Sequence, residues 1–355
     1  MTHQLQERYS KLVLAKMRQE AVLKDGIVFN SDYEGSPKAG AVKIPVRDAE
    51  VQVSDYDRAN GITAGTSSTT YETLVINKDK AVSEVIDGYE ASSVPDNLVA
   101  DRLDSAGYSL AMALDNDGGS VLLAEGTVFN AASVDSTSAY DLVVEVRKEM
   151  SKANVPKQGR YLLATPDFYA MLLKDKDHFV GGSALGDSVK QTGALGKIAG
   201  FTVYEWNDST ANLQFIAGHP KFATRVNEFS VPVKVEDMKD GKHIGASWVN
   251  GRMVYAHKVL RGSAIRPVFS PGSLSLSQSS YSSGKCKITV SQTAASSFAY
   301  RVNPANRAKF NEDFSESPAF VSGSTDITCS KGDVIEIIDL DSTSKCVNVG
   351  YITVS

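Results

Sequence analysis

The feature that most restricts the fold of this chain is a pair of alternating segments near its N-terminus. Apolar residues recur at every second position from Val42 to Val46, and a second strand-like run extends from Tyr71 to Ile76. A period of two is typical of β-strands with one covered face. Residues 54–68, between the two runs, are polar and rich in turn formers. This pattern predicts a long hairpin with a wide tip. Because a two-stranded ribbon is only marginally stable in water, we expect it to lie on another surface.

The N-terminal segment has a different period. In residues 2–24 apolar side chains such as Leu5 and Leu12 recur at three- and four-residue spacing, with polar residues between them. This spacing predicts an amphipathic helix, which Asp25-Gly26 would end because glycine adopts a left-handed conformation without steric cost. Its apolar stripe needs a partner, either its own domain or a neighbouring subunit.

Two further helices are predicted in the middle of the chain. Residues 96–117 carry one apolar stripe that includes Leu103 and Leu110, and Gly118-Gly119 is expected to end this helix. Residues 139–153 repeat the pattern over a shorter length.

A compact α/β passage is predicted next. Residues 160–164 form an apolar strand, after which Thr165 is the expected cap of a helix with Pro166 in its first turn. Residues 198–206 indicate another strand. Residues 212–268 alternate in the manner of a β-meander.

The composition changes near residue 269. Residues 269–280 contain many serines and are typical of a linker. Short strand-like runs alternate with turns beyond it, which predicts an all-β module over 271–355, a small sandwich of the immunoglobulin-like kind.

Composition and motifs argue against several functions. The 355 residues carry a formal net charge of −5, whereas proteins that grip nucleic acid through phosphates usually have a basic surplus. No run is long and apolar enough for a membrane helix, and the N-terminus lacks the apolar core of a signal peptide. The three cysteines are odd in number and widely spaced, which favours a reducing compartment.

No pattern of residues indicates catalysis or metal binding. The five histidines are scattered, there is no Cys-x-x-Cys pair, and no Gly-x-Ser-x-Gly elbow occurs. We therefore predict no catalytic residue, no metal and no cofactor. An enzyme whose catalytic groups meet only in the folded chain stays an alternative.

The order of the predicted parts resembles the Hong Kong 97 capsid fold of tailed double-stranded DNA bacteriophages over residues 1–268. Several weak local similarities, taken in order, support it. They lie at residues 40–46 with 53–57 (the extended loop), 160–173 (a strand and helix of the axial domain), 196–203, 219–223 and 251–256.

The resemblance implies an α+β major capsid protein and a division of the chain. The expected parts are an N-terminal arm at 1–38, an extended hairpin loop at 39–80, a capsid core with peripheral and axial domains at 81–268, and the C-terminal module at 271–355. In such a subunit the helix with Leu103 and Leu110 is the spine. Contacts between subunits are then expected at Leu5 and Leu12 in the arm, and at Lys43, Arg47, Asp55, Asp57 and Arg58 in the hairpin.

The implied function is self-assembly. Copies of the chain would form hexamers and pentamers of an icosahedral virion shell, assembled in the host cytoplasm, that encloses DNA without sequence-specific binding. A separate scaffolding protein and a portal are expected partners, and no membrane is. Two structural alternatives stay open: an encapsulin-type nanocompartment shell, and another virion component such as a tail-tube or decoration protein.

Overall fold

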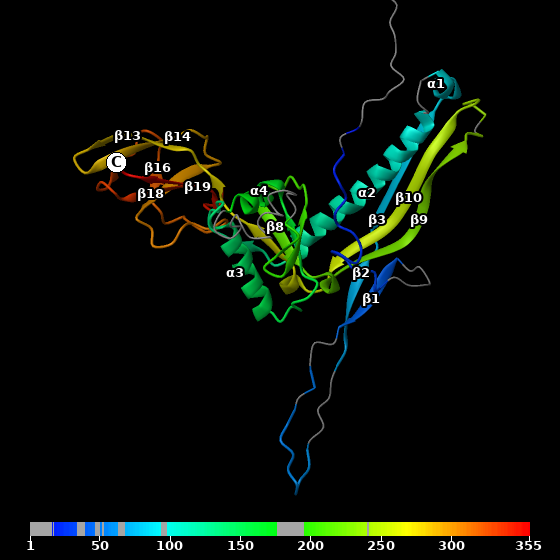
Figure 1. Cartoon of the computed structure of the whole chain (residues 1–355), viewed down its shortest axis with the longest axis horizontal. Coiled ribbons are helices and arrows are strands. Elements are labelled where there is room, and N and C mark those ends of the chain that lie inside the picture. Colours follow the sequence, from blue (N-terminus) through cyan, green and yellow to red (C-terminus); the bar gives the residue numbers. More distant parts are fainter. Residues whose placement is uncertain are drawn as a thin grey trace, which may run out of the picture. The chain divides into compact units, whose positions relative to one another are not determined.

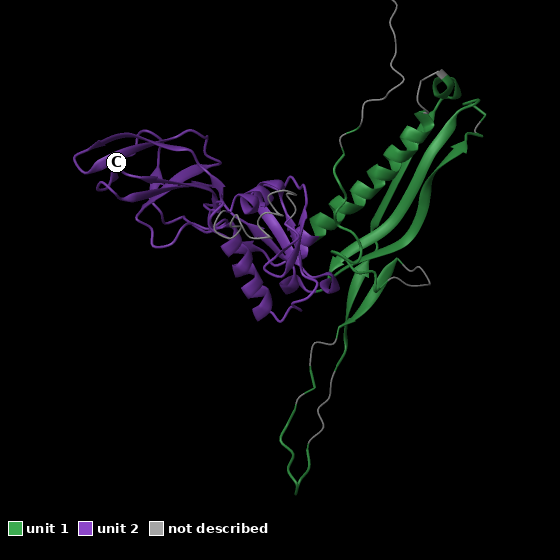
Figure 2. Ribbon diagram, in the orientation of Figure 1, with its two compact units in different colours: residues 1–121, 223–260 green, residues 122–222, 261–355 purple. Residues whose placement is uncertain are grey.

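The computed structural model describes residues 16, 18–33, 40–46, 50–51, 53–62, 68–93, 98–175, 195–239 and 241–355. Helices and sheets are mixed, as the sequence predicts. The chain divides into two compact units, which are coloured separately in Figure 2. Unit 1 comprises residues 1–121 and 223–260, and unit 2 comprises residues 122–222 and 261–355.

Unit 1 is built on a long helix, α2 (Leu98–Glu125), and a three-stranded antiparallel sheet (Figure 1). Strand β10 (Ser247–Val259) lies between β3 (Lys78–Ile86) and β9 (Ala223–Asp237). Buried Ala106 of the helix packs with Ile86 and Val249 of the sheet, and Leu103 lies against this cluster. A short helix, α1 (Gly88–Ser93), precedes α2.

The paired ends of the predicted hairpin are confirmed. Strand β1 (Ala41–Val46) pairs antiparallel with β2 (Thr70–Val75), so that Ile44 faces Glu72 and Val42 faces Leu74. The base of the hairpin is anchored, because Ile44 and Leu74 are buried against Val226 and Ala256 of β9 and β10. The hairpin thus has one covered face, which explains its period of two. Residues 78–80 belong to β3 and not to this hairpin, and β3 itself was not predicted.

The expected helix over 2–24 is wrong where the structure describes it, since residues 16 and 18–24 are not helical; the remainder lies outside the described residues. The segment instead follows α2: Lys16 pairs with Asp101 at 2.7 Å, and the Leu23 amide donates to the Asp115 carboxylate at 2.7 Å. Seven residues of the arm therefore cover the same length as fourteen of the helix. Extended chain rises about 3.3 Å per residue and a helix about 1.5 Å, so only an extended arm stays in step with α2.

The second correction concerns the end of α2. The helix continues through Gly118-Gly119 to Glu125. A Cβ on Gly118 would lie 3.0 Å from the Phe29 ring, so this glycine permits a close approach and does not end the helix. Leu122, one turn later, is fully buried, and its burial continues the helical core beyond the glycines.

Unit 2 contains a six-stranded mixed sheet flanked by α3 (Ala139–Lys152) and α4 (Pro166–Lys174). Its order is β4-β11-β8-β5-β7-β6. The predicted helix over 139–153 is confirmed, and so is the cap of α4, where Thr165 Oγ1 accepts from the Phe168 amide. The strands of this sheet are β4 (Phe129–Asn130), β5 (Tyr161–Ala164), β6 (Lys197–Ile198), β7 (Phe201–Glu205), β8 (Leu213–Gly218) and β11 (Arg266–Phe269).

The expected single meander over 212–268 is wrong. Strands β8 and β11 pair within the sheet of unit 2, whereas β9 and β10 form the sheet of unit 1. Alternation identifies strands but does not say which sheet each one joins.

The remaining strands form two sheets, β12-β19-β18-β15-β16 and β13-β14-β17, with shared buried residues such as Ile288 and Ile337 between them. The expected linker over 269–280 is wrong, because Ser270 and Leu274 are buried and most of the segment is strand. The strands are β12 (Gly272–Ser273), β13 (Leu276–Ser282), β14 (Lys285–Val290), β15 (Ser297–Val302), β16 (Ala319–Phe320), β17 (Ile327–Thr328), β18 (Val334–Leu340) and β19 (Cys346–Thr353).

Candidate assembly surfaces

The described residues hold no group of three or more His, Cys, Asp or Glu side chains that could bind a metal ion. Two histidines are buried or nearly so, and both have hydrogen-bond partners. His219 Nε2 lies 2.9 Å from the Gln158 carbonyl, while its Nδ1 accepts from the Lys221 amide. His257 Nε2 accepts from Arg225. Burial lowers the pKa of both rings, so each is a neutral part of the fold.

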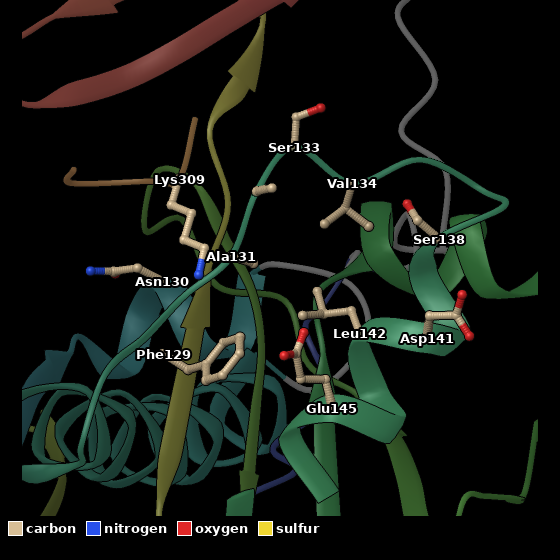
Figure 3. A pocket seen from close by; sticks show the side chains of 11 residues that line it. Phe129, Asn130, Ala131, Ser133, Val134, Ser138, Asp141, Leu142, Glu145 and Lys309 are labelled. Atoms are coloured by element: carbon tan, nitrogen blue, oxygen red, sulfur yellow. The ribbon is translucent and has the colours of Figure 1, made fainter. Parts of the chain in front are cut away.

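One hollow of about 220 Å³ lies beside α3 (Figure 3). Phe129 and Leu142 line it together with Asp141 and Glu145 of α3, and Lys309 lies across from them. Ser138 contributes a hydroxyl to this hollow, and it donates to Asp135 at 2.9 Å in the turn before α3. The hydroxyl of Ser138 is bound to a carboxylate that shapes a turn, and no histidine lines the hollow. This arrangement does not match a serine nucleophile activated by a general base.

The hairpin carries several of the most exposed apolar side chains among the described residues. Val51 and Val53 are 91% and 99% exposed, and Tyr56 is 70% exposed. Single exposed apolar side chains are common, but several close together on one segment are typical of an interaction surface. In Figure 1 this part of the chain extends beyond β1 and β2. The hairpin therefore presents apolar surface that its own unit does not cover.

Asp57 shapes the tip of the hairpin. Its carboxylate accepts from the Ala59 amide at 2.8 Å and from the Asn60 side chain at 2.7 Å, and these bonds lower the pKa of the group. Gly61 closes the turn. Its φ is positive, at 71°, and its backbone amide donates a hydrogen bond to the Asp57 carbonyl at 2.8 Å. Asp57 thus orders the tip locally, whatever else it contacts.

The other predicted contact residues fall into three groups. Lys43, Asp55 and Arg58 are exposed on the hairpin. Leu103 and Leu110 lie on the face of α2 turned to the sheet, where Leu110 is 5% exposed. Leu5, Leu12 and Arg47 lie outside the described residues. The three exposed hairpin residues are accessible to another subunit, and their role in subunit contact stays a prediction.

The arm does not leave its apolar residues for a neighbour as far as it is described. Leu23, Val28 and Phe29 are all buried within unit 1. Of the two partners that the sequence left open, the chain's own domain is therefore the one that covers this stretch. Arg225 helps to hold this stretch, because its guanidinium donates to the Leu23 carbonyl at 2.7 Å.

Sequence reasoning missed a second candidate surface, the face of β3-β10-β9 turned away from α2. Val249 packs on α2, so its neighbours along β10, Trp248 among them, point the other way. On this face Trp248 is paired with Val85, which is 49% exposed, and Phe229 of β9 is 42% exposed. The sequence signal for this surface was the alternation of side chains in β9 and β10. Alternation separates the two faces of the sheet, but it does not say which face remains uncovered.

A long helix on a sheet and a projecting ribbon with uncovered apolar groups are features of a structural protein that assembles. Comparison with known proteins agrees. Residues 90–266 match the model of a phage capsid protein family. No match was found among curated proteins.

Solved capsid structures share the fold. A chain of Mycobacterium phage Che8 is 25% identical, with a TM-score of 0.63, and the match covers 74% of this chain and 96% of that one. The capsid structure of the cyanophage P-SCSP1u is 13% identical, with a TM-score of 0.62 and coverage of 74% and 92%. The capsid of a native GTA particle is 13% identical, with a TM-score of 0.57 and coverage of 75% and 95%.

The chain is a phage major capsid protein with the Hong Kong 97-type fold, and its place is in the virion. No helix among the described residues is long and apolar enough to cross a membrane.

Proposed function

We propose that this chain assembles with copies of itself into hexamers and pentamers, which close into an icosahedral head around double-stranded DNA. The observation that carries the proposal is the exposure of Val51 and Val53 on a ribbon whose base is anchored in its own unit. Covering one valine side chain fully is worth roughly 1.5–3 kcal/mol, and a closed shell repeats such a contact in every subunit. Weak single contacts then give a stable shell by their number.

In this proposal the hairpin, which is residues 39–77 once 78–80 are assigned to β3, lies across the adjacent subunit. The arm at 1–38 reaches a further subunit through its N-terminal part, while residues 18–33 remain bound to unit 1 of their own chain. Residues 81–268 form the peripheral and axial domains, and 271–355 is an immunoglobulin-like addition outside the common core. A separate scaffolding protein and a portal complete the head, and assembly takes place in the host cytoplasm.

The relation to DNA is confinement. The formal net charge of −5 disfavours tight phosphate binding, because each phosphate contact needs a positive charge to displace a counterion. We therefore expect weak binding of the isolated subunit to DNA. Tight binding that falls steeply with added salt would contradict this part.

The experiment changes Val51 and Val53 together to aspartate. Both side chains are almost fully exposed, so the subunit should keep its thermal stability and circular dichroism. Shells seen by negative-stain electron microscopy should be lost, because each contact would have to bury an unpaired charge. Val321→Asp is the matched control, since Val321 is also exposed (61%) but lies in the C-terminal part.

Two results would contradict the proposal. One is a normal yield of shells from the double variant. The other is the appearance of tubes, or of monomers only, from the unchanged chain expressed with the rest of its head proteins.

A further inference from the structure

Cys286 and Cys329 are neighbours in the smaller C-terminal sheet. Cys286 lies on β14, where its direct partner on β17 is Ile327. Cys329 lies two residues after Ile327, directly beyond the end of β17. Its amide donates to the Gly284 carbonyl at 3.0 Å, and this hydrogen bond continues the pairing with β14. Residues two apart on a strand share a face, so the two cysteines are diagonal cross-strand neighbours on one face.

The pair lies in the apolar core between the two C-terminal sheets. Cys286 is 1% exposed and Cys329 is 6% exposed, and Ile288 and Ile335 belong to the same cluster. Cys346 is also buried, but it belongs to a separate cluster with Phe314 and Leu340. All three cysteines are free thiols in the structure. Two cysteines on one face of the sheet in one cluster, and a third in another cluster, form an internal comparison.

We propose that Cys286 and Cys329 are an oxidation site that forms a disulfide bond across β14 and β17 when the folded chain meets an oxidising medium. The proposal goes beyond assembly and depends on the proposed function only for its timing. A virion that leaves its host cell passes from a reducing compartment to an oxidising one, where disulfides persist.

The reaction balances with a small disulfide such as oxidised glutathione as the oxidant. The Cys329 thiolate, which is the more exposed, attacks one glutathione sulfur, and the first glutathione leaves as a thiol. The Cys286 thiolate then attacks Cys329 Sγ, the mixed disulfide breaks, and the second glutathione leaves. The two cysteines lose two electrons and two protons, the glutathione disulfide gains both, and one sulfur–sulfur bond replaces another.

Burial explains why the pair stays reduced until then. It raises the pKa of Cys286 to about 12, with further contributions from the Cys329 thiol. Because the thiolate is the nucleophile, a protonated buried thiol reacts slowly. The bond, once formed, closes the chain from 286 to 329, which includes β15 and β16, and a cross-link of this kind restricts the unfolded chain.

The test uses the full chain, purified with reductant and then incubated with oxidised glutathione without denaturant at a pH of about 8, where thiols exchange. Free thiols are then alkylated in denaturant, and the intact mass is measured. We expect one alkylated cysteine in place of three. A peptide map without reductant should contain one linked pair, from the segments around 286 and 329, and the melting temperature should rise.

Matched variants separate the pair from general oxidation. Cys346→Ser should still form the bond and retain no alkylated cysteine. Cys329→Ser should keep Cys286 and Cys346 alkylated, and its circular dichroism before oxidation checks that it is folded. Three alkylated cysteines after prolonged exposure, a glutathione adduct that never resolves, or a linked peptide that contains Cys346 would each overturn the proposal. None of these outcomes bears on shell formation, so the two proposals fail separately.

Discussion

Arg225 donates from Nε to Nε2 of His257 over 2.9 Å, and the bond sets the protonation of the histidine. A nitrogen that accepts carries no proton, so the neutral ring holds its proton on Nδ1. The same guanidinium donates to the Leu23 carbonyl and to Asp25, and it lies 4.9 Å from the centre of the Phe29 ring. One buried arginine thus joins the arm to β9 and β10.

The first prediction concerns pH. Burial, and next the charge of Arg225, lower the pKa of His257 to about 3, whereas an unfolded histidine titrates near 6.5. Between these values the unfolded chain binds the proton and the folded chain does not. Stability from this group is therefore complete above a pH of about 6.5 and is lost as the pH falls toward 3. Between pH 7 and pH 5 the loss from this group is about 2 kcal/mol.

His257→Gln supplies the control for this prediction. The glutamine oxygen can accept from Arg225 Nε but does not titrate. Urea unfolding of the unassembled subunit at the two pH values should show a smaller loss of stability for the variant. Parallel pH curves for the two proteins would mean that His257 titrates alike in the folded and the unfolded chain.

The arm shows why its conformation could not be predicted from its own residues. Its spacing is compatible with a helix, and local propensity is a weak prior that tertiary contacts override. The partners that fix it, Asp101, Asp115 and Arg225, are 85 or more residues away in sequence. By contrast, the hairpin was predictable because its buried face, Ile44 and Leu74, imposes a period of two on the adjoining residues.

The second prediction compares two glycines of α2. A Cβ on Gly107 would have no atom within 4 Å, whereas one on Gly118 would meet the Phe29 ring at 3.0 Å and His257 Nε2 at 3.3 Å. Gly107→Ala should raise the free energy of unfolding by up to about 1 kcal/mol, the helix preference of alanine over glycine. Gly118→Ala should lower it by about 1–2 kcal/mol, because the buried Phe29 ring has to move.

Denaturant unfolding of the unassembled subunit measures both changes. Equal stabilisation by the two alanines would show that the close packing of Phe29 on Gly118 is not maintained in solution.

The candidate surfaces were predictable only in part, for a physical reason. Alternation locates Val51 and Val53 near a strand, but their exposure depends on where the rest of unit 1 ends. Strand β3 was missed because Lys78, Asp79 and Lys80 interrupt its pattern. Pairing with β10 and the bond between Arg252 and Asp79 hold it in the sheet.

The third prediction concerns the spine helix. Leu110 is 5% exposed, and its Cδ1 would lie 3.2 Å from a Cβ on Gly251, so the leucine fills the space over β10. Leu110→Arg places a charge in this packed apolar contact, and burial of a charge without a partner is strongly unfavourable. Soluble subunit and particles should both be lost.

Ala111→Arg, one position along α2 on an exposed site, is the matched control. It adds the same charge, but the side chain can remain in water, so the subunit should keep its melting temperature. Leu110→Ala is the graded variant and should cost about 2–5 kcal/mol through the cavity it leaves. Electron microscopy and thermal unfolding of all three variants decide the outcome. If Leu110→Arg formed normal shells, Leu110 would not be packed between α2 and β10. If Ala111→Arg stayed folded but formed none, this exposed face of α2 would itself be a contact between subunits.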